Sequence, residues 1–388
     1  MTDPDKKLLD SLPEELADLP FGSPEFKDAN ERLAQEDMDN CAEVMRAMPT
    51  WVNLTGTTVC NLKCFMCNQA LDPDIPKWFM KDEVYQRAVA ELYPFAKMVQ
   101  FSAFGEPLMT PQLDSKLDDL ARANTKLDII TNATLMKDQK TRDKLLRVLG
   151  HVIFSLDGAT AETYNQVRIG ADFDRVVANI EAFCASRLDL PEAERPTLGF
   201  NFILMHRTIR EAPQFVRLAH AFGAQQVTFN HLVVFDDTLK DESLQFHQDL
   251  SNECLTETRR LADELKVNVT MPPLFNAADN GGVGLGVGSE PMPTPRQVDG
   301  PGMPTVKCMF LWKRVYIGVN GEVIPCCLAG VPSFGNMLDD GFQAVWNSET
   351  YQTYRRHVYT ESPHGMCKNC YLIYPSPDQV EAEGFLKF

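Results

Sequence analysis

Short apolar runs alternate with longer amphipathic stretches through most of this 388-residue chain, from residue 51 onward. The strand candidates are 51–56, 98–103, 127–131, 151–156, 198–205 and 226–231. The helix candidates between them are 82–92, 111–123, 138–149, 172–186 and 209–222. Such alternation predicts right-handed βαβ units and a parallel sheet. Six units are too few for a closed eight-fold barrel, so the pattern predicts an α/β fold with a partial, open (β/α)6 TIM-like barrel.

Composition divides the chain into four parts. Residues 1–49 carry helical patterns with too little apolar surface for a domain of their own, so we expect this extension to pack on the rest of the chain. Residues 50–272 form the predicted barrel, and 273–306 are a connector rich in glycine and proline. Residues 307–388 form a small, cysteine-rich C-terminal domain.

Charge and cysteine usage limit the partners and the compartment. The chain has 37 Lys and Arg against 54 Asp and Glu, a net charge of −17, which argues against binding a nucleic-acid backbone. No apolar run approaches the ~20 residues of a membrane span, and the acidic N-terminus does not resemble a secretory signal. We therefore expect a cytoplasmic protein whose eleven cysteines bind metal more readily than they form disulfides.

Three cysteines with C-x3-C-x2-C spacing, Cys60, Cys64 and Cys67, directly follow the first predicted strand. A 4Fe–4S cluster usually has four thiolate ligands, so three would leave one iron open to a substrate or cofactor. A structural zinc loop that takes a fourth ligand from elsewhere is the alternative, although zinc sites usually show paired C-x2-C halves.

At these residues the sequence resembles the radical S-adenosylmethionine (SAM) superfamily, whose motif has this spacing. The resemblance implies that the amino and carboxylate groups of SAM chelate the open iron. It also implies that one electron from the reduced cluster yields methionine and a 5'-deoxyadenosyl radical, which abstracts hydrogen from the substrate. The residue before the third cysteine is usually aromatic and stacks near the adenine; here it is Met66.

The ends of the next predicted strands carry further residues that match this family. Phe104-Gly105-Glu106-Pro107 resembles its Gly-Gly-Glu motif, so the resemblance assigns Glu106 to the ammonium of SAM. Asn132 stands in a Thr-Asn sequence that resembles the Thr-Asn-Gly of many members.

Two later residues resemble those of SPASM-type members of the family. The resemblance assigns Ser155 and Arg168 to the carboxylate and ribose side of SAM. Asp157, two residues after Ser155, is expected to serve the turn. His231, in the last predicted strand, is more typical of a structural histidine than of a substrate contact.

A second group of cysteines lies near the C-terminus: Cys308, Cys326, Cys367 and Cys370. A hairpin pattern over 315–326, turned at Asn320-Gly321, predicts that Cys308 and Cys326 come together. The C-x2-C pair then completes four thiolates, which suit a closed 4Fe–4S cluster or zinc. Cys327 has no predicted role.

The C-x12-G-x4-C spacing of Cys308, Gly321 and Cys326 resembles the SPASM auxiliary-cluster domain, as does a later "GN…WN…R" run that includes Trp346-Asn347 and Arg355. No cysteine follows Cys370, so the resemblance implies the shortened twitch version, a β-hairpin plus helix with one auxiliary 4Fe–4S cluster.

These features predict a radical SAM enzyme with two 4Fe–4S clusters and SAM. It would abstract hydrogen from a small polar substrate and pass an electron to the auxiliary cluster, a net oxidation, with flavodoxin or ferredoxin as the external reductant. Epimerisation and carbon–carbon bond formation, which begin with the same hydrogen abstraction, remain open as alternative reactions. One alternative is a radical SAM maturase that modifies a ribosomally made peptide. The other is a non-catalytic iron–sulfur electron carrier or zinc-stapled binding module.

Overall fold

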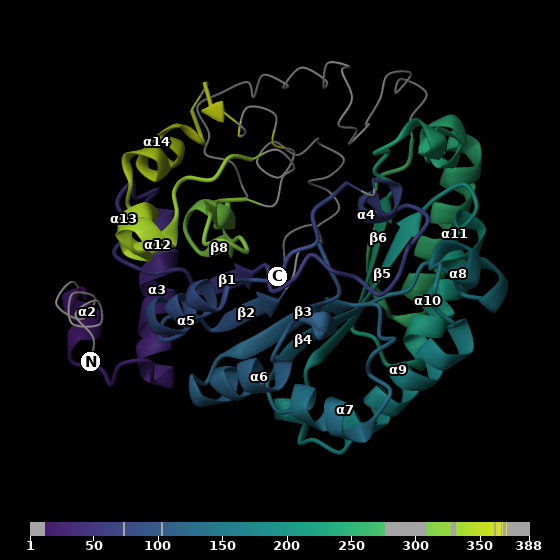
Figure 1. Cartoon of the computed structure of the whole chain (residues 1–388). Coiled ribbons are helices and arrows are strands. Elements are labelled where there is room, and N and C mark those ends of the chain that lie inside the picture. The colour runs from purple at the N-terminus through teal and green to yellow at the C-terminus, as the bar shows by residue number, and fades with distance from the viewer. Residues whose placement is uncertain are drawn as a thin grey trace. The chain divides into compact units, whose positions relative to one another are not determined.

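The computed structural model describes residues 12–72, 74–101, 104–275, 308–326, 331–360, 362–365, 367 and 370. Nine strands form one mostly parallel sheet in the order β7-β6-β5-β4-β3-β2-β1-β8-β9 (Figure 1). The strands are β1 (Trp51–Leu54), β2 (Met98–Phe101), β3 (Lys126–Thr131), β4 (Leu149–Ser155), β5 (Thr197–Leu204), β6 (Gln226–His231), β7 (Asn268–Thr270), β8 (Arg314–Ile317) and β9 (Val323–Ile324). The predicted α/β fold class is confirmed.

Helices occupy most of the connections between the strands. They are α2 (Glu14–Ala17), α3 (Pro24–Asp39), α4 (Asn68–Leu71), α5 (Asp82–Glu91), α6 (Leu113–Arg122), α7 (Gln139–Leu146), α8 (Ala161–Val167), α9 (Phe173–Leu188), α10 (Ala212–Ala221), α11 (Gln248–Leu265), α12 (Met337–Asp340), α13 (Phe342–Trp346) and α14 (Glu349–His357). None of the helices in the described residues is both long and apolar enough to cross a membrane.

The chain folds into two compact units. The first consists of residues 1–59, 77–129 and 295–375, and the second of 60–76, 130–294 and 376–388. Strand β3 therefore begins in the first unit and ends in the second. The predicted connector at 273–306 lies outside the described residues except for its first three, and Cys327 lies outside them too.

In the first unit, the C-terminal hairpin extends the sheet of the predicted barrel. Strand β8 pairs in parallel with β1, from Trp51 opposite Arg314 to Leu54 opposite Ile317, and turns back into β9. The predicted hairpin is confirmed, and its attachment to β1 was not apparent from the sequence.

Alternating side chains give these strands two different faces. Val52, Leu54, Val99 and Phe101 are almost fully buried and form an apolar face, as expected for strands covered by helices. Intervening positions on neighbouring strands hold a buried polar row of Asn53, Gln100 and Asp128, which Arg314 joins. Arg314 Nε donates to Asn53 (2.8 Å) and Gln100 Nε2 to Asp128 (2.7 Å), so the charged ends of the row are hydrogen-bonded.

The N-terminal extension contacts the rest of this unit, since Asn30 Nδ2 of α3 donates to Phe95 O (3.3 Å). Asn30 of α3 bonds the main chain of Met48 in both directions, at 3.0 Å each. Residues 42–47, which we call the connecting segment, lead from α3 toward β1. Trp346 Nε1 donates to Ala47 O (3.1 Å) and Arg355 Nη1 to Glu43 O (2.9 Å). The SPASM-like tryptophan and arginine therefore bind the main chain just before the first strand.

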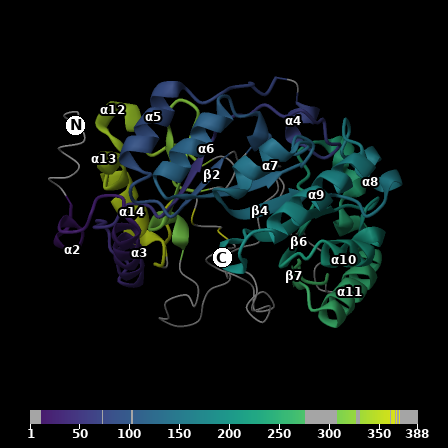
Figure 2. The same cartoon turned by 90° about the horizontal axis from the view of Figure 1, so that it is seen from below.

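The second unit contains β4 to β7 with α7 to α11 (Figure 2). Rings of Phe154, Phe200, Phe202, Phe215 and Phe229 contact one another in its core, with centroids 4.8 to 6.0 Å apart. Aromatic pairs at these distances contribute beyond their buried area. This core supports the carboxyl ends of β4 to β6, where residues of the candidate site begin.

Candidate radical SAM site and auxiliary cysteine site

Residues 60–67, the three-cysteine loop, are fixed by main-chain hydrogen bonds to the end of α8. Lys63 N donates to Ile169 O (2.9 Å) and Phe65 N to Val167 O (2.8 Å). Arg207 stacks on the ring of Phe65, 3.8 Å from its centroid, and binds Glu242. The loop therefore has a defined conformation within the second unit.

The three thiols share one apolar cluster. Buried Cys64 packs with Met66, Val167 and Met205, among others, and Cys60 and Cys67 pack against this cluster. Among the described residues of the cluster these are the only cysteines. Burial raises the pKa of Cys64 to about 11; Arg168 opposes this shift, while the charges of Cys60 and Cys67 add to it. Three thiolates here thus need a bound cation, which the irons of a cluster would supply.

Polar hydrogens point at two of these sulfurs. Asn132 Nδ2 lies 3.9 Å from the Sγ of Cys60, and Arg168 Nη1 lies 3.7 Å from the Sγ of Cys64. Hydrogen bonds of this kind to cluster sulfurs adjust a cluster's reduction potential. The structure therefore brings Asn132 and Arg168 to the predicted cluster ligands.

Arg168 is held by a fully buried carboxylate. Asp157 Oδ2 accepts from Nε (2.6 Å) and lies 2.5 Å from Nη2, while Oδ1 accepts from Ile203 N (2.7 Å). Burial, the largest single influence, opposes the charge on Arg168, but the Asp157 carboxylate together with Cys64 and Tyr164 outweighs it and raises the pKa of the guanidinium. The sequence pattern around Asp157 predicts only a turn and misses this role; the signal available was an acid 11 residues before a predicted ligand-binding arginine.

The other predicted SAM contacts in the second unit occupy three different settings. Asn132 is buried and also bonds Asn61 (3.0 Å) and Thr134. Ser155 is the half-buried last residue of β4. Met66 is 9% exposed and packs in the apolar cluster.

Glu106 lies in the first unit, next to Val59, the residue that precedes the three-cysteine loop. Its N–H donates to Val59 O (3.0 Å), and its carboxylate caps the 3-10 turn Pro107–Met109 through Leu108 N (3.2 Å). A Cβ on Gly105 would lie only 2.6 Å from Val59 O, so only glycine allows this close approach. The Gly-Glu pair thus holds a buried carboxylate on the stretch of chain that leads from β1 to the cysteines.

The auxiliary cysteines, Cys308, Cys326, Cys367 and Cys370, lie in the first unit and are mostly buried. Cys326 and Cys308 belong to one apolar cluster with Phe310 and Tyr316, as the hairpin pattern predicted. Burial and the charges of Cys370 and Cys367 raise the pKa of Cys308 to about 12. These thiols fit a cluster that supplies positive charge.

Two observations concern other possible sites. In the described part of the chain, no three His, Cys, Asp or Glu side chains surround a single metal-ion position; a 4Fe–4S cluster binds its thiolates through separate irons.

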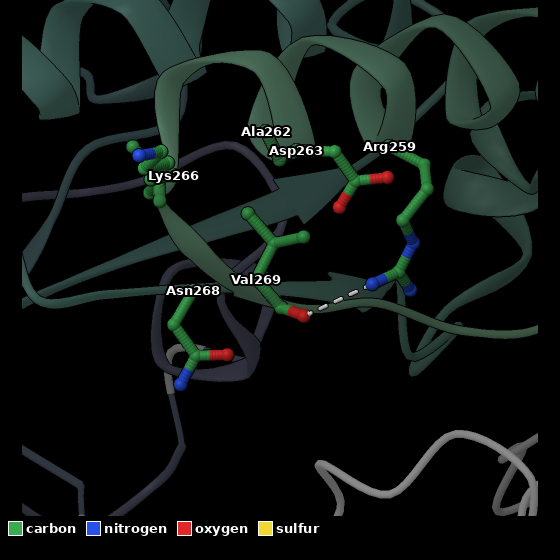
Figure 3. A pocket seen from close by; sticks show the side chains of 7 residues that line it. Arg259, Ala262, Asp263, Lys266, Asn268 and Val269 are labelled. Carbon is green, nitrogen blue, oxygen red and sulfur yellow. Dashed lines mark hydrogen bonds between the residues drawn. The ribbon is translucent and has the colours of Figure 1, made fainter.

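A hollow lined by Arg259, Asp263 and Lys266 lies between α11 and β7 (Figure 3). Asn268 also lines this hollow and is the first residue of β7, at the amino end of that strand. Catalytic residues of such barrels lie at the opposite, carboxyl ends of the strands.

Two family models match the chain. Residues 54–219 match the radical SAM superfamily, and residues 308–371 match SPASM, an iron–sulfur cluster-binding domain. The chain therefore belongs to the radical SAM superfamily. It is a radical SAM enzyme with a SPASM domain, which implies SAM, a SAM-binding 4Fe–4S cluster and auxiliary iron–sulfur binding as its cofactors.

Relatives of this chain cover most of its length at low identity. It is 21% identical to the tungsten-containing aldehyde ferredoxin oxidoreductase cofactor-modifying protein of Pyrococcus furiosus, over 83% of this chain and 87% of that protein. It is also 21% identical to the PqqA peptide cyclase of Rhodopseudomonas palustris, over 82% of this chain and 79% of that one. The crystal structure of Streptococcus suis SuiB bound to S-adenosylmethionine shares the fold, with a TM-score of 0.58, 16% identity, and coverage of 89% of this chain and 76% of that one.

Proposed function

We propose that Cys60, Cys64 and Cys67 hold a 4Fe–4S cluster whose remaining iron binds SAM. The observation that carries this proposal is the shared apolar cluster of the three thiols, with the Arg168 guanidinium 3.7 Å from Cys64. Three thiolates leave one coordination position open, and a buried setting excludes water from it.

The residues assigned to SAM would orient it on this cluster. Glu106 suits its ammonium group, because a carboxylate forms a strong hydrogen bond to a cation. Ser155 and Arg168 would bind its carboxylate and ribose side. Asp157 directs two of the Arg168 nitrogens away from the thiols, so that Nη1 is the nitrogen beside Cys64.

The reduced cluster with bound SAM would supply methionine and a 5'-deoxyadenosyl radical, using one electron from an external reductant such as flavodoxin or ferredoxin. A substrate C–H bond breaks, and its hydrogen atom completes 5'-deoxyadenosine. The substrate radical then loses a proton to a base and one electron to an oxidant, which completes a two-electron oxidation of the substrate. A closed cluster on the auxiliary cysteines suits the role of that oxidant.

A small polar molecule is the substrate class that the strands favour. The polar row places two amides, a carboxylate and a guanidinium, hydrogen-bonded to one another, where an apolar filling would otherwise stabilise a barrel. A ribosomally made peptide is the second candidate, because the similar Rhodopseudomonas palustris protein is a PqqA peptide cyclase. Deuterium transfer into 5'-deoxyadenosine from labelled candidates of each class distinguishes the two.

Anaerobic reconstitution with iron, sulfide, SAM and dithionite tests the cleavage step. We expect 5'-deoxyadenosine from the wild type and none from Cys64→Ala. Cys184→Ala is the matched control, because Cys184 is a half-buried thiol of α9 outside both cysteine groups. A protein that binds zinc and no iron, or one that carries a loaded cluster but leaves SAM intact, would refute the proposal.

The electron acceptor has its own test. Cys367→Ala should retain part of the SAM cleavage and lose formation of oxidised product, because only the second electron transfer depends on the auxiliary cysteines. If Cys367→Ala made product at the wild-type rate, the auxiliary cysteines would have no part in the oxidation.

A further inference from the structure

Strands β4 to β7 of the second unit carry a row of uncharged polar side chains, of which the proposed reaction uses only the first. Ser155 lies opposite Asn201, Asn201 opposite Thr228, and Thr228 opposite Thr270. We call these four residues the neutral row. Neighbouring strands lie about 5 Å apart, so the side chains form a continuous line across the sheet.

The neutral row lies on the face of the sheet opposite the helices. Phe154 contacts Phe183 of α9, and Phe202 contacts Phe215 of α10, with ring centroids 5.5 and 4.8 Å apart. Successive side chains of a strand point to opposite faces, so the row members that adjoin these strand phenylalanines in sequence point away from the helices. The row members are half-buried, whereas Phe154 and Phe202 are fully buried.

The row has unused hydrogen-bonding capacity. Within the described residues, the side chains of Ser155, Asn201 and Thr270 form no hydrogen bond, and Thr228 Oγ1 accepts one long bond from Gln226 Nε2 at 3.5 Å. Each of these groups can both donate and accept. Polar groups that are partly shielded from water are usually paired. The row is therefore suited to a ligand that brings hydrogen-bonding groups of its own.

The row also lies close to the three-cysteine loop of the same unit. Ile203, two residues beyond Asn201 on the same face of β5, packs against the apolar cluster that contains Cys64. Two residues of a strand span about 7 Å, so the row lies roughly one layer of side chains from this cluster. Its first member, Ser155, is the residue assigned to SAM. A molecule bound to the rest of the row would therefore lie beside SAM.

We propose that Asn201, Thr228 and Thr270 bind the substrate, and that the part of the substrate held there is uncharged and carries hydroxyl groups. This inference rests on the proposed function, which supplies the radical, and it adds the substrate class. A charged group would lose hydration here without gaining an oppositely charged partner, since Asp157, which bonds the main chain of β5, is already paired with Arg168. A hydroxyl group donates and accepts, as the row does.

The test uses the full chain, reconstituted anaerobically with iron and sulfide and supplied with SAM and dithionite. Glycerol deuterated at carbon is the probe. Lactate, ethanolamine and N-methylacetamide, labelled in the same way, supply an anion, a cation and an amide for comparison. The 5'-deoxyadenosyl radical breaks a C–D bond of the bound probe, and the deuterium atom joins the 5'-carbon. The probe radical then takes one electron from dithionite and a proton from water.

Mass spectrometry gives the fraction of 5'-deoxyadenosine that carries deuterium, which does not depend on how much of the protein is active. Thr228→Val removes one hydroxyl of the row at nearly constant shape, and Thr228→Ser keeps it. Thr270→Val repeats the change on the neighbouring strand. Thr197→Val is the matched control, because Thr197 is an exposed threonine on the same face of β5, four residues before Asn201.

We expect glycerol to give the largest labelled fraction in the wild type. Thr228→Val and Thr270→Val should each lower that fraction about fivefold, as for the loss of one hydrogen bond. Thr228→Ser and Thr197→Val should keep it.

Wild-type labelled fractions in both Thr228→Val and Thr270→Val would overturn the inference. So would the absence of deuterium transfer from glycerol to the wild type, or a larger fraction from a charged probe or from the amide. A wild-type protein that forms no 5'-deoxyadenosine would instead refute the proposed cleavage of SAM, so the two failures are distinguishable.

Discussion

Asn347 and Met45 exchange two hydrogen bonds, although nearly the whole chain separates them. Met45 N–H donates to the side-chain oxygen of Asn347 (2.8 Å), and the Asn347 amide nitrogen donates to Met45 O (2.9 Å). The side chain thus pairs with the connecting segment as a neighbouring strand would. This arrangement gives a physical reason for the Trp-Asn pair of the SPASM-like sequence.

Asn347→Ala should destabilise the protein by about 2 kcal/mol, because it leaves the N–H and C=O of buried Met45 without these partners. The denaturation midpoint in urea measures the loss. Asn268→Ala, which removes an exposed amide, should change stability by less than ~0.5 kcal/mol. Equal effects of the two variants would contradict the role assigned to Asn347.

Lys27→Met should destabilise the protein by about 2–3 kcal/mol. The Lys27 ammonium, 2% exposed, donates to Ala123 O (2.6 Å), Ala96 O (2.9 Å) and Thr125 Oγ1 (2.6 Å). It lies at the C-terminal end of α6, where a cation also favours the helix dipole. Lys126→Met removes an exposed lysine nearby and serves as the control in thermal unfolding. A methionine variant as stable as this control would show that the buried ammonium contributes nothing.

Asp157→Asn should lower the rate of SAM cleavage about 10- to 100-fold. Changes of this size are usual when the partner that orients a ligand-binding residue is removed. The amide can still accept from Ile203 N, but the charge of Arg168 loses its buried partner. We also expect a loss of about 3 kcal/mol in stability, since one half of a buried ion pair remains.

The double variant Asp157→Asn/Arg168→Met separates these two effects. It should recover part of the stability, because no buried charge is left uncompensated, while SAM cleavage stays low. Cleavage that returned together with stability would show that the ion pair serves the fold alone.

Stability should fall as the pH drops from about 6.5 to 4, in part because of His231. Burial lowers the pKa of His231 to about 4, so in this window the unfolded chain binds a proton that the folded chain does not. The contribution is present above pH 6.5 and is lost toward pH 4. In acid denaturation, His231→Gln should reduce the stability lost between pH 6.5 and pH 4 by about 1–2 kcal/mol. His220→Gln, at an exposed position of α10, should leave that loss unchanged. The same slope in both variants would disprove the assignment.

Local patterns predicted the fold class well. Alternation of apolar residues located β1 to β6, and the spacing of Cys60, Cys64 and Cys67 limits them to one short loop that follows β1. The ends of helices and strands were predicted less accurately. The helix predicted to reach residue 149 ends at Leu146, and β4, predicted to begin at residue 151, begins at Leu149. Apolar residues such as Val148 suit either element, so hydrophobicity alone does not place the boundary.

Relationships between distant residues could not be predicted. Nothing near Arg314 in the sequence indicates that it completes a polar row with Asn53 and Gln100 on two other strands. Cys184 and Cys254 lie in helices and are half-buried, because a helical period gives a face but not how deeply a neighbour covers it.

The pairing of β1 with β8 also orders events while the chain is being made. Strand β1 is translated early and can pair with β2 soon afterwards, but its other edge receives β8 only near the end of synthesis. An unpaired strand edge is a template for intermolecular association, and contacts of such long range form slowly. A chain released before β8 is translated would leave β1 open on one side, and that open edge would favour aggregation.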